Sequence, residues 1–161
     1  MLVDALTALQ DWAPVAALRH SRWIYASVNA AHIIGIALLF GAIVPLDLRL
    51  IGRRREVPIR TMARTLLPVA IAGLVLAVVA GLALFSIRAV KYAGTGLFQV
   101  KMALLACAVT NALLLNHAAQ WEAQQAKVGV APPLRLRLAG ALSIVLWLSV
   151  IACGRMLAFV D

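Results

Sequence analysis

The sequence places side chains that can bind metals or carry protons inside long apolar segments. His32 lies nine residues after Trp23 in such a segment, and Asn29 precedes it by about one helical turn. Ionisable groups at membrane depth are costly, so each is a candidate for function. An imidazole there can ligate a metal ion or haem iron, or relay a proton. The structural alternative is a neutral histidine hydrogen-bonded to a neighbouring helix.

Sulfur donors fall at a predicted depth similar to that of His32. They are Met102, Cys107, Cys153 and Met156. Imidazole, thiolate and thioether together suit copper, above all Cu(I), and a His/Met pair can hold haem iron. The spacing is not that of a Cys-x-x-Cys motif, and each of these residues taken singly is also a typical packing residue. Because both cysteines lie in apolar segments, we expect free thiols.

Further polar residues lie near the ends of the apolar segments. Lys101, about one turn inside the third segment, is a candidate contact for an anionic ligand or a quinone oxygen. Asp47 and Arg49 close the first segment, where we expect Asp47 to pair with a nearby arginine or to cap the turn. His117 ends the third segment at the surface opposite His32, so the two histidines cannot ligate one haem. We find no paired carboxylates, serine–histidine–acid set or phosphate-binding glycine loop, and expect no enzyme.

The elements that carry these residues are transmembrane helices. The 161 residues are 64% hydrophobic and 13% charged, and the mean hydropathy is +0.96. A soluble domain is about half apolar and a quarter charged, so the composition excludes soluble, disordered and nucleic-acid-binding proteins. A span needs about 20 apolar residues. We predict an all-α bundle of four transmembrane helices in one domain, residues 1–161, with spans at about 23–46, 66–86, 97–116 and 138–159.

The N-terminal residues predict a short amphipathic helix at the membrane surface. Leu2, Leu6 and Leu9 share one helical face, Pro14 interrupts the pattern, and Trp12 is an expected interfacial anchor. Asp4 and Asp11 stand where a signal peptide carries basic residues, so we do not interpret this segment as one.

Small residues at four-residue spacing predict a close helix pair. The second segment contains Gly73, Ala77 and Gly81, and the first contains Ala31, Gly35 and either Gly41 or Ala42. Such rows let two helix backbones approach closely within lipid. We therefore expect the first two spans to form a tight antiparallel pair.

The basic residues indicate an orientation. Nine of the fifteen Lys and Arg residues lie on the side of the loops after the first and third spans, including Arg53, Arg54 and Arg55. The positive-inside rule then places the arginine-rich loop in the cytoplasm and both termini in the periplasm. The Arg triplet can also attract anionic lipid head groups.

The first span carries a resemblance to a known family. The stretch from Trp23 to His32, then Gly35 and Gly41, and the sequence Asp-Leu-Arg-Leu-Ile-Gly at 47–52 resemble a family of small bacterial four-helix inner-membrane proteins. Residues 98–101 and 111–117 resemble the same family, which is distantly similar to the membrane domain of copper-resistance protein D. The resemblance covers nearly the whole chain. It implies a bacterial inner-membrane location and a link to copper, with His32 as the ligand that carries over.

Three hypotheses follow for the function. The first is a non-enzymatic protein that handles copper or another redox metal near the periplasmic face, with His32 as the anchor ligand. The second is a haem b electron-transfer subunit with His32 as an axial ligand. The third is a structural or assembly subunit of a larger membrane complex. We expect the lipid bilayer as a partner, leave membrane or periplasmic subunits and a homo-oligomer open, and expect no nucleic acid.

Overall fold

The computed structural model describes the chain except for residues 118–120, 122–123, 125–126, 128 and 160–161. Every element in the described part is helical. The elements are α1 (Leu2–Asp11), α2 (Ala13–His20), α3 (Arg22–Ile51), α4 (Ile59–Ile87), α5 (Ala89–Gly94), α6 (Gly96–Asn116), α8 (Leu134–Met156) and the 3₁₀ helix η1 (Leu157–Phe159). Four of them, α3, α4, α6 and α8, are long and apolar enough to cross a membrane. The predicted fold class is confirmed, and the chain is a multi-pass membrane protein.

The long helices extend beyond the predicted spans at the arginine-rich end of the bundle. There α3 continues to Ile51, while α4 begins at Ile59 and α8 at Leu134. At the other end α8 ends at Met156, and the 3₁₀ helix η1 begins at the next residue, Leu157. A run of apolar residues corresponds to the part of a helix that lies inside the hydrocarbon core. The helix itself continues beyond that core, because its backbone hydrogen bonds also form in charged turns outside the membrane.

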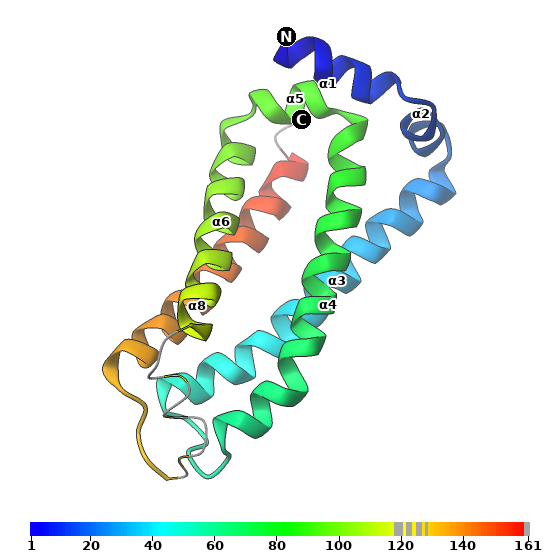
Figure 1. Cartoon of the computed structure of the whole chain (residues 1–161). Coiled ribbons are helices and arrows are strands. Elements are labelled where there is room, and N and C mark those ends of the chain that lie inside the picture. Colours follow the sequence, from blue (N-terminus) through cyan, green and yellow to red (C-terminus); the bar gives the residue numbers. More distant parts are fainter. Residues whose placement is uncertain (118–120, 122–123, 125–126, 128, 160–161) are drawn as a thin grey trace.

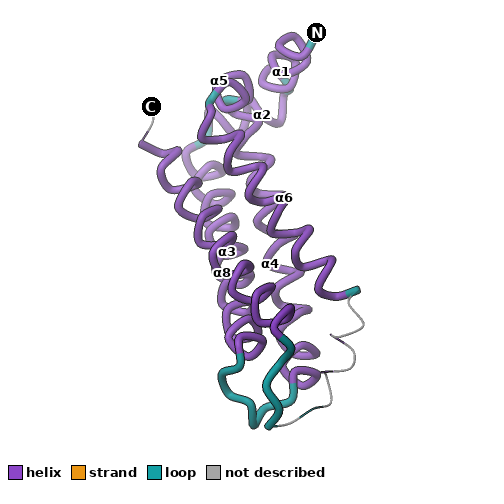
Figure 2. Tube along the Cα trace, turned by 90° about the vertical axis from the view of Figure 1, so that its left-hand side faces the viewer, coloured by secondary structure: helices purple, strands orange, loops and turns teal. Residues whose placement is uncertain are grey.

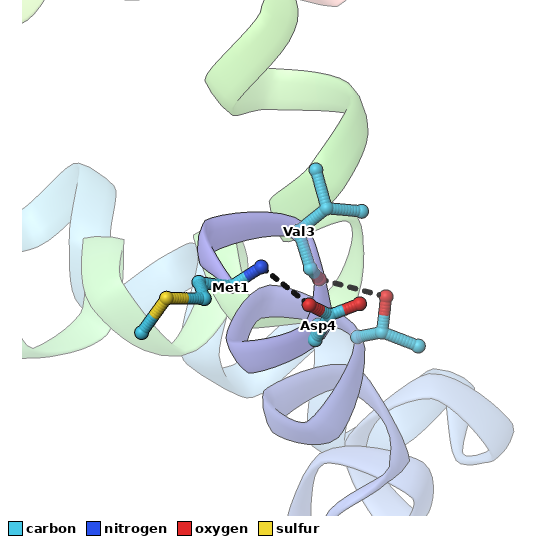
Figure 3. A network of polar contacts seen from close by, with 4 residues as sticks. Met1, Val3 and Asp4 are labelled. Atoms are coloured by element: carbon cyan, nitrogen blue, oxygen red, sulfur yellow. Dashed lines mark hydrogen bonds and ion pairs between the residues drawn. The ribbon is translucent and has the colours of Figure 1, made fainter.

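The N-terminal region forms two short helices where one was predicted. The break is at Trp12, whose ψ of 133° is extended, and Pro14 lies in the first turn of α2. Proline lacks an N–H, so it is tolerated at a helix start but not in its interior. At the start of α1, the amino group of Met1 pairs with Asp4 (Figure 3), and within the helix the Thr7 hydroxyl donates to the Val3 carbonyl.

α1 lies across the end of the bundle opposite the arginine-rich end, beside α5 (Figure 1). The Gln10 amide donates to the Ile87 carbonyl at 3.1 Å, which attaches α1 to the end of α4. Stacked aromatic rings connect α4, α5 and α6 at the same end of the bundle. The ring centroid of Phe85 in α4 lies 5.0 Å from that of Phe98 in α6 and 6.5 Å from that of Tyr92 in α5. This end therefore carries an aromatic cluster suited to a membrane interface.

The four long helices pack in the order α4, α3, α8 and α6 (Figures 1 and 2). Two clusters of buried side chains fill the bundle. The cluster at the arginine-rich end consists of Leu46, Leu50, Ile59, Ala63, Trp121 and Leu136. The central cluster consists of Leu39, Ala42, Ala70, Ala108, Leu146 and Trp147. Among the residues of α6, all of which are described, Ala108 is the one that is fully buried, so α6 is the most exposed span.

The predicted close pair of the first two spans is confirmed. An ideal Cβ on Gly35 would lie 2.5 Å from the Ala77 backbone nitrogen, and one on Gly73 would lie 2.5 Å from the Leu39 nitrogen. Neither position has room for a side chain, so the two backbones are in direct contact. Gly41 does not belong to this contact, because nothing lies within 4 Å of its ideal Cβ.

Gly52 ends α3 at the arginine-rich end. Its φ of 109° is a left-handed conformation that favours glycine. The N–H of Gly52 donates to the Arg49 carbonyl at 3.1 Å, and that of Arg53 donates to the Leu48 carbonyl at 3.0 Å. These bonds satisfy carbonyls that the last turn would otherwise leave free.

Candidate functional site

His32 lies in α3 with its imidazole against α4. Its Nδ1 lies 2.7 Å from the Ala77 carbonyl oxygen, and because a carbonyl only accepts, Nδ1 carries the proton and donates. Gly81 makes room for the ring, since an ideal Cβ there would lie 3.0 Å from the His32 Cε1. The ring is half-buried, as is Asn29 one turn away. This tautomer leaves the Nε2 lone pair available to a ligand.

Lys101 brings a positive charge to the same region of the bundle. It is half-buried on α6, and its Nζ would lie 3.4 Å from an ideal Cβ on Gly154 of α8. It is close enough to His32 and to Cys153 to interact with both electrostatically. Lys101 of α6 thus lies within electrostatic range of both His32 of α3 and Cys153 of α8, and we refer to these three residues as the polar cluster.

The other predicted sulfur donors lie on the outside of the bundle. Met102 is 43% exposed and Met156 is 56% exposed, and Cys107 is also exposed. Cys153 is half-buried, and both cysteines are free, as predicted. Within the described residues, His, Cys, Asp and Glu form no group of three or more that could hold a metal ion. Of the five predicted donors, the polar cluster therefore contains two.

Asp47 is buried at the arginine-rich end, with 3% of its surface exposed. The Ser143 side chain of α8 is its hydrogen-bond partner, whereas its Oδ2 has no partner in the described structure. Of the two roles expected for Asp47, an ion pair with an arginine or a cap on the turn, the ion pair does not form with any described arginine. An ideal Cβ on Gly140 would lie 3.0 Å from the Asp47 backbone carbonyl oxygen, so α8 packs closely against the backbone of α3 here.

Arg49 is buried more completely, with 1% exposed, and supports the loop after α3. Its Nε donates to the Val57 carbonyl at 2.6 Å, and a terminal nitrogen lies 3.4 Å from the Arg55 carbonyl. Because Arg49 and Asp47 are two residues apart on a helix, their side chains leave it in different directions. Arg49 therefore positions the loop, while Asp47 faces α8.

The residues that sequence reasoning missed are uncharged polar groups on α8 and α6. Ser143 and Trp147, four residues apart on α8, are both buried, and the Trp147 indole nitrogen has no described partner. Asn111 of α6 donates to the Ala139 carbonyl at 3.1 Å and connects α6 to α8. The four-residue spacing of Ser143 and Trp147 was a usable signal, because it places both on one helix face.

Two cavities open on the bundle away from the polar cluster. One, of about 540 Å³, lies between α6 and α8 and is lined by Asn111, Arg135 and mostly leucine and alanine side chains. The other, of about 360 Å³, lies between the start of α4 and the end of α6 and contains two arginines. His117 is exposed at that end of α6.

The chain was compared with known proteins, and the geometry described above is what a functional proposal rests on. No protein-family model, curated protein or solved structure matches the chain. The fold is that of a multi-pass membrane protein with four candidate spans.

Proposed function

We propose that this membrane protein is non-enzymatic and binds a soft metal ion, in the first place Cu(I), through His32 and Cys153. The observation that carries the proposal is the hydrogen bond from His32 Nδ1 to the Ala77 carbonyl. Histidines that ligate metals almost always donate their other ring N–H to a carbonyl or carboxylate, which fixes the tautomer and orients the ring. His32 has this arrangement with the Ala77 carbonyl.

The donor set of the polar cluster fits Cu(I) better than it fits harder cations. Thiolate and imidazole are ligands that Cu(I) accepts, and Cu(I) tolerates low coordination numbers. The ammonium group of Lys101 is close enough to Cys153 to provide a counter-charge to a metal-bound thiolate. Met102, Met156 and Cys107 do not belong to this set, because their side chains face outward. The resemblance of the first span to a family distantly similar to copper-resistance protein D favours the same metal.

The polar cluster supports the haem alternative less well. A bis-histidine haem needs a second imidazole on the opposite side of the iron, and His117 lies at the other end of α6. The imidazole of His32 also lies against the α4 backbone, with the Gly81 position 3.0 Å away. We therefore place a metal ion, and not a haem, at His32.

A role as a subunit of a larger membrane complex is the second candidate. The observation that favours it is the exposure of α6, which packs mainly on α8 and buries little of its surface in the bundle. A partner helix on this face would be compatible with metal binding at the polar cluster. Stoichiometric co-purification of another membrane protein, with no bound metal, would favour this candidate instead.

To test the proposal, we would measure the affinity of the full chain, purified in mild detergent, for Cu(I). Copper is kept reduced, and a chromophoric chelator competes for it. We expect one Cu(I) per chain and at least a tenfold loss of affinity in His32→Gln and Cys153→Ser, the range that disturbed metal sites show. Glutamine keeps an amide that can donate to Ala77, so the fold is preserved.

The matched control is His117→Gln, which removes an exposed imidazole at the other end of α6. It should bind Cu(I) as the unmodified chain does. Unchanged affinity in His32→Gln, in protein that elutes and melts normally, would reject the proposal. Stoichiometric iron with a haem spectrum would replace it with the haem alternative.

A further inference from the structure

We propose that the smaller cavity at the arginine-rich end binds the phosphate group of an anionic phospholipid. The cavity has a volume of about 360 Å³. Its lining combines cationic, amide, indole and apolar groups: Arg60, Ala63, Arg64, Leu67, Pro68, Asn116 and Trp121. This site is separate from the polar cluster and does not depend on metal binding there.

Arg60 and Arg64 supply the charge of the site. They are four residues apart in α4, so they share one helix face about one turn apart. Both are exposed, and neither hydrogen-bonds or forms an ion pair with another described residue. The guanidinium fork matches the oxygens of a phosphate, which it binds through paired hydrogen bonds. Two such groups at one cavity favour an anionic ligand.

The order of groups along α4 indicates an amphiphile. The helix runs from the arginine-rich end into the bundle, so Arg60 comes first, Arg64 follows, and Leu67 and Pro68 lie deepest. A phospholipid has the same order, from its phosphate at the membrane surface to its acyl chains below. A free phosphate ion would gain nothing from the apolar part of the cavity.

Trp121 gives the cavity a fixed wall. It is 4% exposed and packs in the cluster that contains Leu46 and Ile59, so it does not move freely. Asn116, at the end of α6, adds amide hydrogen-bonding groups on the same side. An indole beside basic residues at a membrane boundary is a typical lipid-contacting combination.

Two helix starts add to the positive potential at this end. α4 begins at Ile59 and α8 begins at Leu134, and neither has a side chain that caps its first turn. The free N–H groups and the helix dipole give each start a partial positive charge. Basic cavities between transmembrane helices bind phospholipid head groups in this way.

The experiment measures lipid binding to the full chain in detergent by native mass spectrometry. The probes are phosphatidylglycerol, phosphatidylcholine and inorganic phosphate. We expect Arg60→Gln/Arg64→Gln to weaken phosphatidylglycerol binding about 30-fold, equivalent to about 2 kcal/mol, since each basic residue contributes about 1 kcal/mol at an anionic surface. Arg53→Gln/Arg54→Gln, which removes the same charge from the neighbouring loop, should weaken it less than about threefold.

Each outcome has a defined meaning. A 30-fold loss confined to the Arg60/Arg64 pair, with Lys at both positions restoring part of the binding, supports the site. Equal losses in both double variants would assign the binding to the general surface charge and overturn the proposal. Displacement of the lipid by millimolar inorganic phosphate would identify a free-phosphate site and overturn the lipid assignment. Equal binding of phosphatidylcholine would also overturn it.

Discussion

The close contact between α3 and α4 predicts that a side chain at Gly73 lowers the stability of the bundle. In Gly73→Ala, the new Cβ would lie 2.5 Å from the Leu39 nitrogen and 2.8 Å from the Gly35 carbonyl oxygen. Ordinary contact begins near 3.4 Å, so the two helices must separate locally by about 0.9 Å. Both obstructing atoms belong to the backbone and cannot rotate away as a flexible side chain would.

The expected magnitude is the difference between two opposing effects. Overpacking in a close contact costs about 1–3 kcal/mol, and the upper end applies where the backbone itself must move. Replacing glycine by alanine in a helix returns about 1 kcal/mol. We therefore expect Gly73→Ala to lower the free energy of unfolding by about 2 kcal/mol.

Gly41→Ala is the matched control, because the same substitution in the same helix pair meets nothing within 4 Å. It should raise the free energy of unfolding by up to about 1 kcal/mol. The assay is reversible unfolding in mixed micelles by titration with sodium dodecyl sulfate, followed by circular dichroism. Equal stability of the two variants would refute the close backbone contact between α3 and α4.

Three further predictions concern the arginine-rich end. Gly52→Ala should lower stability by about 1 kcal/mol in the same titration, because an L-residue at a φ of 109° is strained, and an unchanged midpoint would contradict the described helix end. Ser143→Ala should lower the free energy of unfolding by about 1–3 kcal/mol, because it leaves the buried Asp47 carboxyl without its partner. Asp47→Asn removes the buried acid and keeps a hydrogen-bonding group, so it should leave the free energy of unfolding unchanged. If the arginine-rich loop is cytoplasmic, a cysteine at Arg53 in a Cys-free chain should react with an impermeant thiol reagent only after the membrane is permeabilised; labelling of intact cells would reverse the orientation.

The sequence alone determined the fold class and the closest helix contact. Four apolar segments of about 20 residues must form spanning helices. Hydrocarbon offers no hydrogen-bond partners, so the backbone N–H and C=O groups of each segment must bond to one another within a helix. The Gly73 and Gly35 spacing identified the close pair because small residues are what such a contact requires. The free thiols of Cys107 and Cys153 followed from their positions in apolar segments.

Only the tertiary structure decided which polar side chains meet. Depth along a helix can be counted from the sequence, and it placed His32 near four other predicted donors, but an apolar helix in lipid gives no signal for which face turns inward. The fold placed Lys101 within electrostatic range of both His32 and Cys153 and left Met102 and Met156 outside. It likewise paired Asp47 with Ser143 of α8, and no described arginine forms an ion pair with it. Such facing depends on helix rotation, which is fixed by packing between segments distant in sequence.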